Sequence, residues 1–214
     1  MNFGVLGSGS VGQTIAAKLA ECGHAVKVGT RDAAKLSDWQ AQVGSSVSVG
    51  SFAEAAAFGE ILFNCTSGTG SINALHLAGE ANLNGKILID ISNPLDFSKG
   101  MPPSLTICNT DSLGEEIQRT FPALKVVKTL NTLTAQLMVN PALLNNAEHD
   151  LFVSGNDAAA KAQVVALLQR EFGWKTVIDL GDITTARGTE MLLPVWVRLW
   201  GALQTPMFNF KIVR

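Results

Sequence analysis

A glycine-rich segment directly after a short apolar stretch limits the possible folds of this chain most strongly. Residues 3–6 read Phe-Gly-Val-Leu, as expected of a buried parallel strand, and residues 13–22 have apolar side chains at helical spacing. Between them stand Gly7, Gly9 and Gly12 in the pattern Gly-x-Gly-x-x-Gly. In this order the glycines allow a tight turn, the approach of a pyrophosphate, and close packing of helix on strand.

This strand–turn–helix order predicts a dinucleotide-binding unit, in which the free N–H groups at the start of the helix face the phosphates. The residues that we assign to the phosphate-binding turn are Gly7, Ser8, Gly9, Ser10, Val11 and Gly12. A glycine-rich turn with a structural role alone is the alternative.

The rest of the chain alternates between apolar runs and amphipathic segments. We expect strands at 25–29, 47–49, 61–64, 86–91, 126–130, 151–154 and 176–180, and helices at 33–43, 52–58, 72–81, 112–121, 135–144, 158–172 and 183–203. The alternation predicts a doubly wound, mostly parallel α/β sheet of the Rossmann type. We expect a single domain over residues 1–214, with 182–214 as a C-terminal helix, bent or broken at Pro194, and a tail. The three prolines within 92–104 predict an irregular loop.

Composition excludes several classes of function. The net charge of -2 gives no electrostatic footprint for nucleic acid or an anionic membrane. Three cysteines without metal-type spacing predict reduced thiols, no metal site and a cytoplasmic location. A first strand that begins at residue 2 leaves no room for a signal peptide, and the most apolar segment is too short for a membrane span. The absence of tyrosine excludes reductases that protonate a carbonyl through a Tyr/Lys pair.

The end of the second predicted strand indicates which nicotinamide cofactor is bound. NAD sites usually place an acidic residue there, whereas this chain has Gly29 and Thr30, then Arg31, with Lys35 one turn further on. A hydroxyl and two cations suit the 2′-phosphate of NADP, which Arg can bind bidentately. Asp32 argues mildly for NAD, but its position predicts a helix N-cap. Alternatively, Arg31 and Lys35 are ordinary surface charges.

Polar residues follow three other predicted strands at the edge where ligands of parallel sheets bind. Thr66 and Ser67, directly after Cys65, would contact the adenosine side or the pyrophosphate. The amide of Asn93, held extended by Pro94, would bond to the nicotinamide or a partner ring. The full set assigned to cofactor binding at these ends is Cys65, Thr66, Ser67, Asn93, Pro94, Leu95, Asn131 and Thr132. Ordinary turn and cap residues are the alternative.

No side chain stands out as a proton donor, and we assign no catalytic residue. His24 lies at the wrong end of the predicted sheet, and the patterns around His76 and His149 are typical of structural or solvated histidines. Lys128 lies inside an apolar strand, and a functional role is one alternative for it. We expect instead a packed stem with its head at an edge. This points to hydride exchange with a second redox cofactor, in which ring alignment supplies most of the catalysis.

The chain resembles the F420-dependent NADP oxidoreductase family and the cytosolic reductase domain of transmembrane ferric reductases. The residues that carry the resemblance are Gly7-Ser8-Gly9-Ser10-Val11-Gly12, Gly29-Thr30-Arg31 with Lys35, Ser92-Asn93-Pro94-Leu95, Lys128-Thr129-Leu130-Asn131-Thr132, Ile178-Asp179-Leu180-Gly181 and Ala186-Arg187-Gly188-x-Glu190. The resemblance implies that Thr30, Arg31 and Lys35 hold the 2′-phosphate. It also implies that the loops after the fifth and sixth strands, with the start of the terminal helix, frame the nicotinamide and a flavin or deazaflavin.

We therefore expect an NADP(H)-dependent oxidoreductase that passes hydride to a flavin-like or deazaflavin (F420-type) acceptor. The expected partners are this small-molecule acceptor and, in a homodimer, a second copy of the chain; we expect no nucleic acid and no membrane. The aromatic segment 191–200 is core, dimer interface or acceptor surface. One alternative is a small carbonyl or imine reductase, although such enzymes need a sizeable helical domain after the sheet. Another is an NADP(H)-binding redox sensor without turnover, which an exposed apolar patch at Trp196 and Trp200 would favour.

Overall fold

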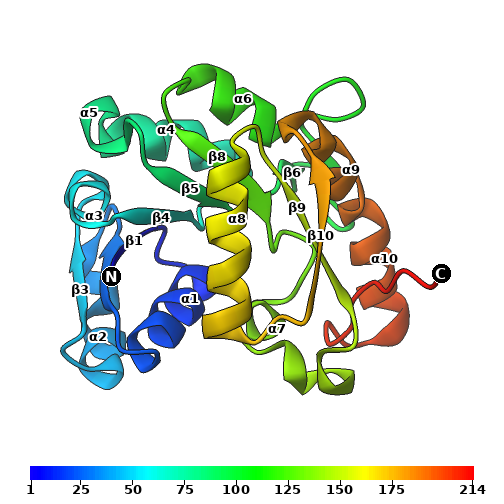
Figure 1. Cartoon of the computed structure of the whole chain (residues 1–214), viewed down its shortest axis with the longest axis horizontal. Helices are drawn as coiled ribbons and strands as arrows, with labels where there is room; N and C mark the ends of the chain where they lie inside the picture. The colour runs from blue at the N-terminus through cyan, green and yellow to red at the C-terminus, as the bar shows by residue number, and fades with distance from the viewer.

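The computed structural model describes residues 1–214, and its centre is an eight-stranded sheet with helices on both faces (Figure 1). The strands are β1 (Asn2–Leu6), β2 (Ala25–Gly29), β3 (Val47–Gly50), β4 (Ile61–Asn64), β5 (Ile87–Asp90), β8 (Lys125–Thr129), β9 (Asp150–Ser154) and β10 (Thr176–Gly181). Their order across the sheet is β10-β9-β8-β5-β4-β1-β2-β3. All neighbouring pairs are parallel except β8 and β9. The predicted Rossmann-type sheet is confirmed.

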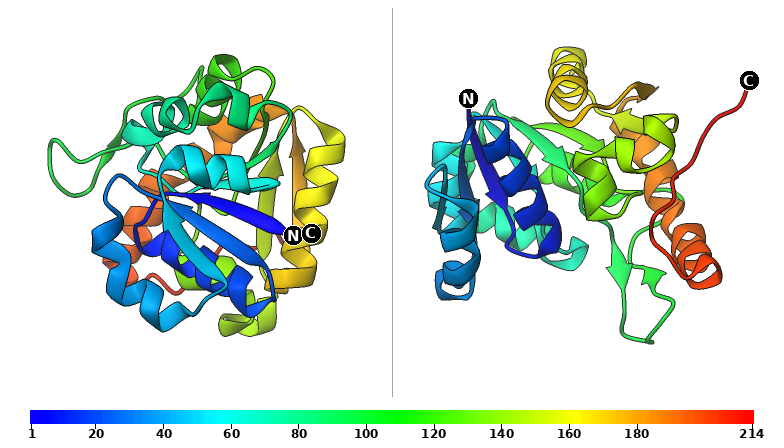
Figure 2. Two further views of the ribbon diagram at one scale, coloured as in Figure 1. Left: turned by 90° about the vertical axis from the view of Figure 1, so that its left-hand side faces the viewer. Right: turned by 90° about the horizontal axis from the view of Figure 1, so that it is seen from below.

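The helices divide between the two faces of the sheet. One face carries α1 (Ser10–Glu21), α7 (Ala135–Val139) and α8 (Ala158–Leu167), and the other carries α3 (Phe52–Phe58), α4 (Gly68–Ala78), α5 (Glu80–Leu83) and α6 (Leu113–Thr120). Near the β3 edge lies α2 (Ser37–Val43), and at the opposite side α9 (Ala186–Met191) and α10 (Leu193–Leu203) run beside the C-terminal tail (Figures 1 and 2).

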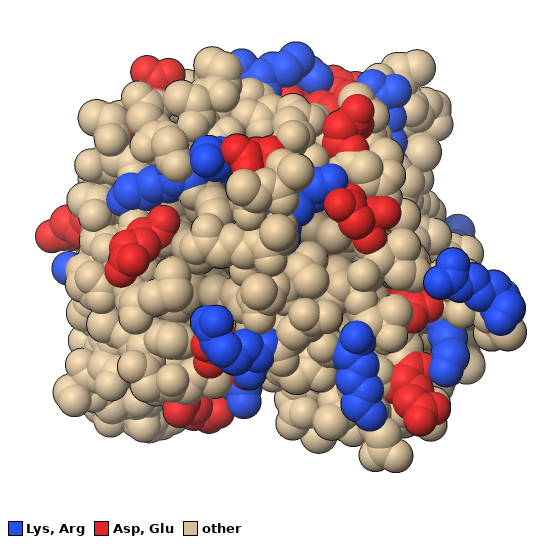
Figure 3. Space-filling model, in the orientation of Figure 1, with Lys and Arg blue, Asp and Glu red and all other residues tan.

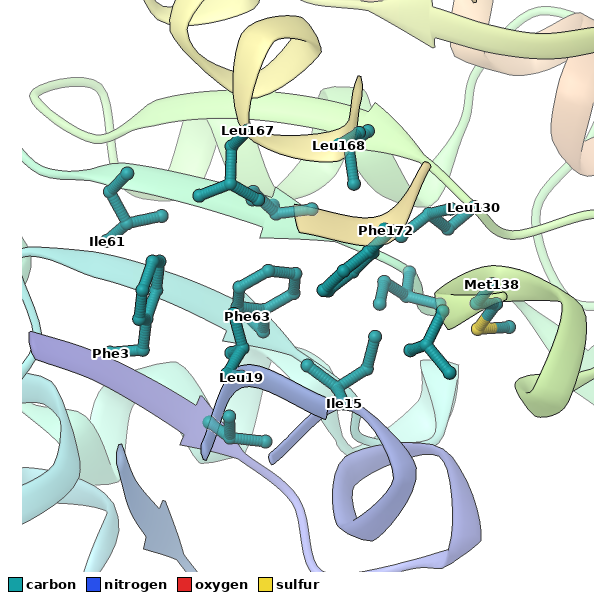
Figure 4. Packing of buried hydrophobic residues seen from close by; sticks show 14 of the residues in the cluster. Phe3, Ile15, Leu19, Ile61, Phe63, Leu130, Met138, Leu167, Leu168 and Phe172 are labelled. Atoms are coloured by element: carbon teal, nitrogen blue, oxygen red, sulfur yellow. The ribbon is translucent and has the colours of Figure 1, made fainter. Parts of the chain in front are cut away.

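Each face of the sheet has its own hydrophobic core because the central strands are apolar at consecutive positions. On β4, Phe63 packs into the core under α1, and its neighbour Leu62 packs into the core under α3 and α4. The rings of Phe3, Phe63 and Phe172 lie in a row on the α1 side, with centroid separations of 6.0 and 6.5 Å (Figure 4). Strands buried on both sides are what helices on both faces require.

Two predicted helices are shorter than expected because of the local backbone. The segment 33–43 consists of a 3₁₀ turn, Ala33–Leu36, followed by α2. In the segment 135–144, α7 ends at Val139 because Asn140 precedes Pro141 and is extended, with φ −147° and ψ 76°. The predicted break of the terminal helix is present: α9 ends at Met191 and α10 carries Pro194 in its first turn.

Two further features differ from the sequence-based expectation. The loop 92–104 is not wholly irregular, since β6 (Leu95–Asp96) and β7 (Ser104–Leu105) pair as a small antiparallel hairpin. The segment between them projects from the body of the molecule (Figure 2). In addition, β9 runs opposite to β8, with Lys128 beside Ser154, so the last two strands run against the rest of the sheet.

The surface has the mixed charge that the composition predicts. On the face seen in Figure 3, Lys and Arg side chains alternate with Asp and Glu and form no large area of one sign. Among the helices, none combines the length and the apolar character needed to cross a bilayer.

A buried group of three charges connects the sheet to the helices at its carboxyl edge. Lys128 Nζ on β8 lies 2.8 Å from Asp90 Oδ2 on β5 and 2.8 Å from Glu190 Oε1 on α9. The Glu190 carboxylate also accepts the N–H groups of Leu113 and Gly114 at the start of α6, at 2.8 and 3.0 Å. We call Lys128, Asp90 and Glu190 the ion triple.

The expectation that the head of Lys128 reaches an edge of the sheet was wrong, because the side chain is 0% exposed. Burial disfavours its charge, but Asp90 and Glu190 outweigh burial, and the pKa of Lys128 is raised above its ordinary value. Folding thus leaves the ammonium charged between two carboxylates, whose excess negative charge faces the N-terminus of α6.

We predict that the glycines of the first turn differ sharply in their tolerance of a side chain. A Cβ on Gly12 would lie 2.0 Å from the carbonyl oxygen of Gly7, whereas a Cβ on Gly9 would meet nothing within 4 Å. Gly12→Ala should therefore lower the free energy of unfolding by about 1–3 kcal/mol. Gly9→Ala should leave it unchanged or raise it by up to about 1 kcal/mol. Urea unfolding measures both, and equal stabilities of the two variants would contradict the prediction.

Lys128→Met should destabilise the fold strongly, because it leaves two buried carboxylates without their cation. We expect a loss of about 3–5 kcal/mol in the free energy of unfolding. The double variant Lys128→Met/Asp90→Asn should lose less, since the remaining carboxylate of Glu190 keeps its two backbone donors. Urea unfolding followed by tryptophan fluorescence compares the two, and a double variant less stable than the single one would refute this account.

The raised pKa of Lys128 also sets the pH dependence of its contribution. A lysine whose pKa is higher in the folded state contributes its full stability below the unfolded-state pKa of about 10.4. The contribution is lost only as the pH rises through the folded-state pKa. The stability contributed by Lys128 should therefore not change between about pH 7 and pH 9.

Candidate functional site

Two adjoining clefts lie at the carboxyl edge of the parallel strands, where ligands of this fold class bind. They share Cys65, Thr66 and Ser67, the residues directly after β4. We call the cleft at the first glycine turn the phosphate cleft, and its neighbour beside α10 the apolar cleft.

The phosphate cleft has a volume of about 260 Å³ and is built by the first turn, the end of β2 and the start of α4. Gly9 stands at the N-cap of α1 with open space in front of it. Gly7 adopts φ +118°, which a residue with a side chain rarely does. The residues that line it are Gly7, Ser8, Gly9, Thr30, Arg31, Phe52, Cys65, Thr66, Ser67, Gly70, Asn73 and Ala74.

The turn after β2 brings hydroxyl and guanidinium groups to the phosphate cleft. Ser8 Oγ and Thr30 Oγ1 are 2.9 Å apart and share a hydrogen bond, and Arg31 lines the cleft beside them. Lys35 does not line it: its side chain is 81% exposed, and its Nζ lies 3.6 Å from Asp32 Oδ2. Asp32 occupies the predicted N-cap position, but its side chain makes no capping hydrogen bond.

The apolar cleft is larger, about 360 Å³, and its walls come from segments far apart in the chain. The ends of β4 and β5 form one side, the residues after β8 and α7 a second, and α10 a third. The residues that line it are Val11, Cys65, Thr66, Ser67, Gly68, Thr69, Ile91, Ser92, Asn93, Leu95, Phe97, Asn131, Leu133, Met138, Leu193 and Trp196. Trp196 packs against Phe208 of the tail, with ring centroids 5.3 Å apart.

Two asparagines from different strand ends pair at this cleft. Asn131 Nδ2 donates to Asn93 Oδ1 at 2.9 Å, and Asn93 Nδ2 donates to the carbonyl oxygen of Asn131 at 2.8 Å. Asn131 Nδ2 also lies 3.2 Å from the carbonyl oxygen of Thr189 on α9. Gly68 packs close by, where a Cβ would lie 2.1 Å from the backbone oxygen of Asn93.

Four other predicted site residues line neither cleft: Ser10, Gly12, Pro94 and Thr132. Ser10 begins α1 but lines neither cleft, and Gly12 is buried against Gly7. The Pro94 carbonyl oxygen accepts the N–H of Thr106 at 2.8 Å and so holds the hairpin, and Thr132 is buried outside both clefts.

Ionisable side chains are scarce around the apolar cleft. Cys65 is the one that lines it, and burial raises the pKa of its thiol, so that it stays protonated at neutral pH. The three histidines lie elsewhere: His24 against Phe3, His76 exposed on α4, and His149 against Pro141 and Trp174. The arrangement can hold and align a planar group, and it offers no carboxylate, imidazole or amine to exchange protons with it.

Sequence reasoning missed much of the apolar cleft. Ile91 and Ser92 adjoin predicted residues, and Phe97 lies two positions beyond Leu95, so continuing the strand-end reasoning would have found them. Leu133 and Met138 follow Asn131 in the chain. Leu193 and Trp196 belong to segment 191–200, for which core, dimer interface and acceptor surface are the alternatives that the sequence leaves open. They line the apolar cleft because α10 folds back across the sheet edge, for which there is no local signal.

Comparison with known proteins agrees with this geometry. Residues 2–94 match the family described as NADP oxidoreductase, coenzyme F420-dependent. A crystal structure from Arthrobacter sp. FB24, named as a candidate F420-dependent NADP-reductase, is 58% identical over 100% of both chains, with a TM-score of 0.97. An imine reductase from Myxococcus stipitatus in complex with NADP⁺ has a TM-score of 0.66 at 18% identity, over 95% of this chain and 64% of its own, and shares the fold.

Curated relatives include two metalloreductases. The rat metalloreductase STEAP3 is 29% identical over 90% of this chain, and the human metalloreductase STEAP2 is 28% identical over 100% of it. The chain spans 37% and 41% of their respective lengths. With a 58% identical relative matched over its full length and a family model over the first glycine turn and five strands, this chain belongs to the coenzyme F420-dependent NADP oxidoreductase family.

Proposed function

We propose that this protein transfers hydride between NADP(H) in the phosphate cleft and a planar flavin or deazaflavin acceptor in the apolar cleft. The observation that carries the proposal is the junction of the two clefts at Cys65, Thr66 and Ser67. A dinucleotide whose phosphates occupy the first cleft extends its nicotinamide into the second.

The residues of the phosphate cleft fit the anionic part of NADP(H). The first N–H groups of α1 and the open space at Gly9 suit a pyrophosphate. Arg31 and Thr30 provide a guanidinium and a hydroxyl for the 2′-phosphate, and no carboxylate lines this cleft to select the free 2′-hydroxyl. Lys35 is exposed and pairs with Asp32, and in this proposal it leaves Asp32 for the 2′-phosphate when the cofactor binds.

The residues of the apolar cleft suit alignment rather than proton transfer. When bound, NADPH supplies a hydride, which carries two electrons to the acceptor ring, and the reduced acceptor takes up its proton from bulk solvent after it leaves the cleft. Leu193, Met138 and Trp196 provide flat apolar contact and exclude water. The paired Asn93 and Asn131 present amide groups to a ring edge. In this proposal, alignment of the two rings contributes more to the rate of hydride transfer than acid–base groups do, since Cys65 is the only ionisable side chain that lines the cleft.

One observation favours a different class of function. Helix α10 exposes Trp200 (43%), together with Val195 (48%) and Leu203 (54%), apolar side chains of the kind that a sensor would present to a partner protein, whereas Trp196 is only partly exposed and lines the apolar cleft. A sensor would bind NADP(H) without turnover. The imine-reductase alternative has less support, because it needs a proton donor in the apolar cleft.

The proposal predicts that NADPH binds at least tenfold more tightly than NADH, a difference of about 1.4 kcal/mol. Arg31→Ala should remove most of this preference, because it deletes the cation that lines the phosphate cleft, and it should leave the NADH affinity nearly unchanged. Isothermal titration with both cofactors measures this. Lys35→Ala is the matched control and should change the NADPH affinity by less than Arg31→Ala. Equal affinities for NADPH and NADH in the native protein would refute the assignment.

A screen of NADPH oxidation with F420, FMN, FAD, ferric chelates and a cyclic imine tests the function itself. We expect turnover with a flavin or with F420. His76→Ala and His149→Ala should each lower it less than tenfold, since neither histidine lines a cleft, whereas removing a general acid–base residue typically costs about a hundredfold or more. NADPH binding without turnover of any acceptor would favour the NADP(H)-binding sensor. Turnover with the cyclic imine alone would favour the imine-reductase alternative.

A further inference from the structure

We propose that Lys128 is a positioning residue for hydride transfer, because its ammonium joins the asparagine pair of the nicotinamide end to the α9–α10 wall of the apolar cleft. The inference rests on the proposed function and goes beyond it. Lys128 lines neither cleft and is 0% exposed, so it acts only through the groups that it holds.

The first link runs from Lys128 to Ser92. Lys128 Nζ donates to the backbone oxygen of Ser92 at 2.5 Å and to Asp90 Oδ2 at 2.8 Å. Asp90 Oδ1 accepts the N–H of Ser92 at 3.2 Å and its hydroxyl at 2.6 Å. Ser92 is thus held from both sides, and it lines the apolar cleft directly before Asn93.

The second link runs along the chain from Lys128 to Asn131. Between them Leu130 is buried and adopts φ 61°, in the left-handed region that a leucine rarely occupies. Such a conformation persists only where the surroundings enforce it. It places Asn131 against Asn93, whose position the first link controls.

The third link runs from Lys128 to the acceptor wall. Lys128 Nζ lies 2.8 Å from Glu190 Oε1, and the preceding residue, Thr189, accepts a hydrogen bond from Asn131. Leu193 and Trp196, which line the apolar cleft, follow Glu190 by three and six residues. One ammonium therefore sets the position of the nicotinamide contacts relative to the wall against which the acceptor stacks.

The test uses the double variant Lys128→Met/Asp90→Asn, which removes the contacts of Lys128 in the first and third links without leaving both buried carboxylates uncompensated. Its control is Lys161→Met/Asp179→Asn, a second Lys–Asp pair with Nζ 2.8 Å from Asp179 Oδ1, in which Lys161 is largely buried and Asp179 is 54% exposed, and neither residue lines a cleft. Titrations with NADPH and with ADP-ribose 2′-phosphate, which lacks the nicotinamide, separate the two ends of the cofactor site.

We expect the double variant to bind ADP-ribose 2′-phosphate within twofold of the native affinity and NADPH at least fivefold more weakly. The control should bind both within twofold. Unchanged NADPH affinity, or an equal loss for both ligands, would overturn the role of Lys128. If the native protein binds neither ligand, the proposed function itself is refuted. Binding of both ligands to the native protein is therefore measured before any variant is compared.

Glu190→Gln tests the third link by itself and keeps the proposal falsifiable if the double variant does not fold. We expect native NADPH affinity, at least tenfold lower turnover with the acceptor found in the screen, and a larger primary isotope effect with NADPH deuterated at C4. These results would show misalignment in the hydride step. An isotope effect and a turnover equal to those of the native protein would overturn the link.

Discussion

The close approach of α1 to the first glycine turn is the contact on which the rest of the structure depends. Gly12 packs directly against the carbonyl oxygen of Gly7, leaving no space for a Cβ. This contact seats the helix on β1 with its first N–H groups at the carboxyl edge of the sheet, so the phosphate cleft forms there. Because β1 lies between β2 and β4, both neighbouring strands also end at this edge and supply Arg31 on one side and Thr66 on the other.

The ion triple is a second contact that fixes helices against the sheet, at the other end of the candidate site. Lys128, Asp90 and Glu190 connect two strands, α9 and the start of α6 in a region with no access to water. Burying three charges is costly, and hydrophobic residues of similar volume often stabilise a fold as well or better. The ion triple lies behind the asparagine pair, to which Lys128 is connected through its contact with the backbone oxygen of Ser92.

Much of the fold could be predicted because its signals are local. The bounds of β2, α3 and β4 agree residue for residue with the segments 25–29, 52–58 and 61–64, since each is a short apolar run between turn residues. The two strand ends that line the phosphate cleft follow from the rule that parallel strands end at one edge. Strand direction has no such local signal, and for that reason the reversal of β9 was not anticipated.

By itself the sequence determined a Rossmann-type sheet, a glycine turn at Gly7, Gly9 and Gly12, and a strand end at which Thr30 and Arg31 stand without an acidic residue at Gly29 or Thr30, because each depends on neighbouring residues. Only the tertiary structure decided that Lys128 is buried between two carboxylates and that Trp196 lines a cleft. Glu190 and α10 are distant in sequence from the strands that they contact. Their proximity results from the packing of α9 and α10 across the sheet edge, and local residue patterns do not determine such long-range contacts.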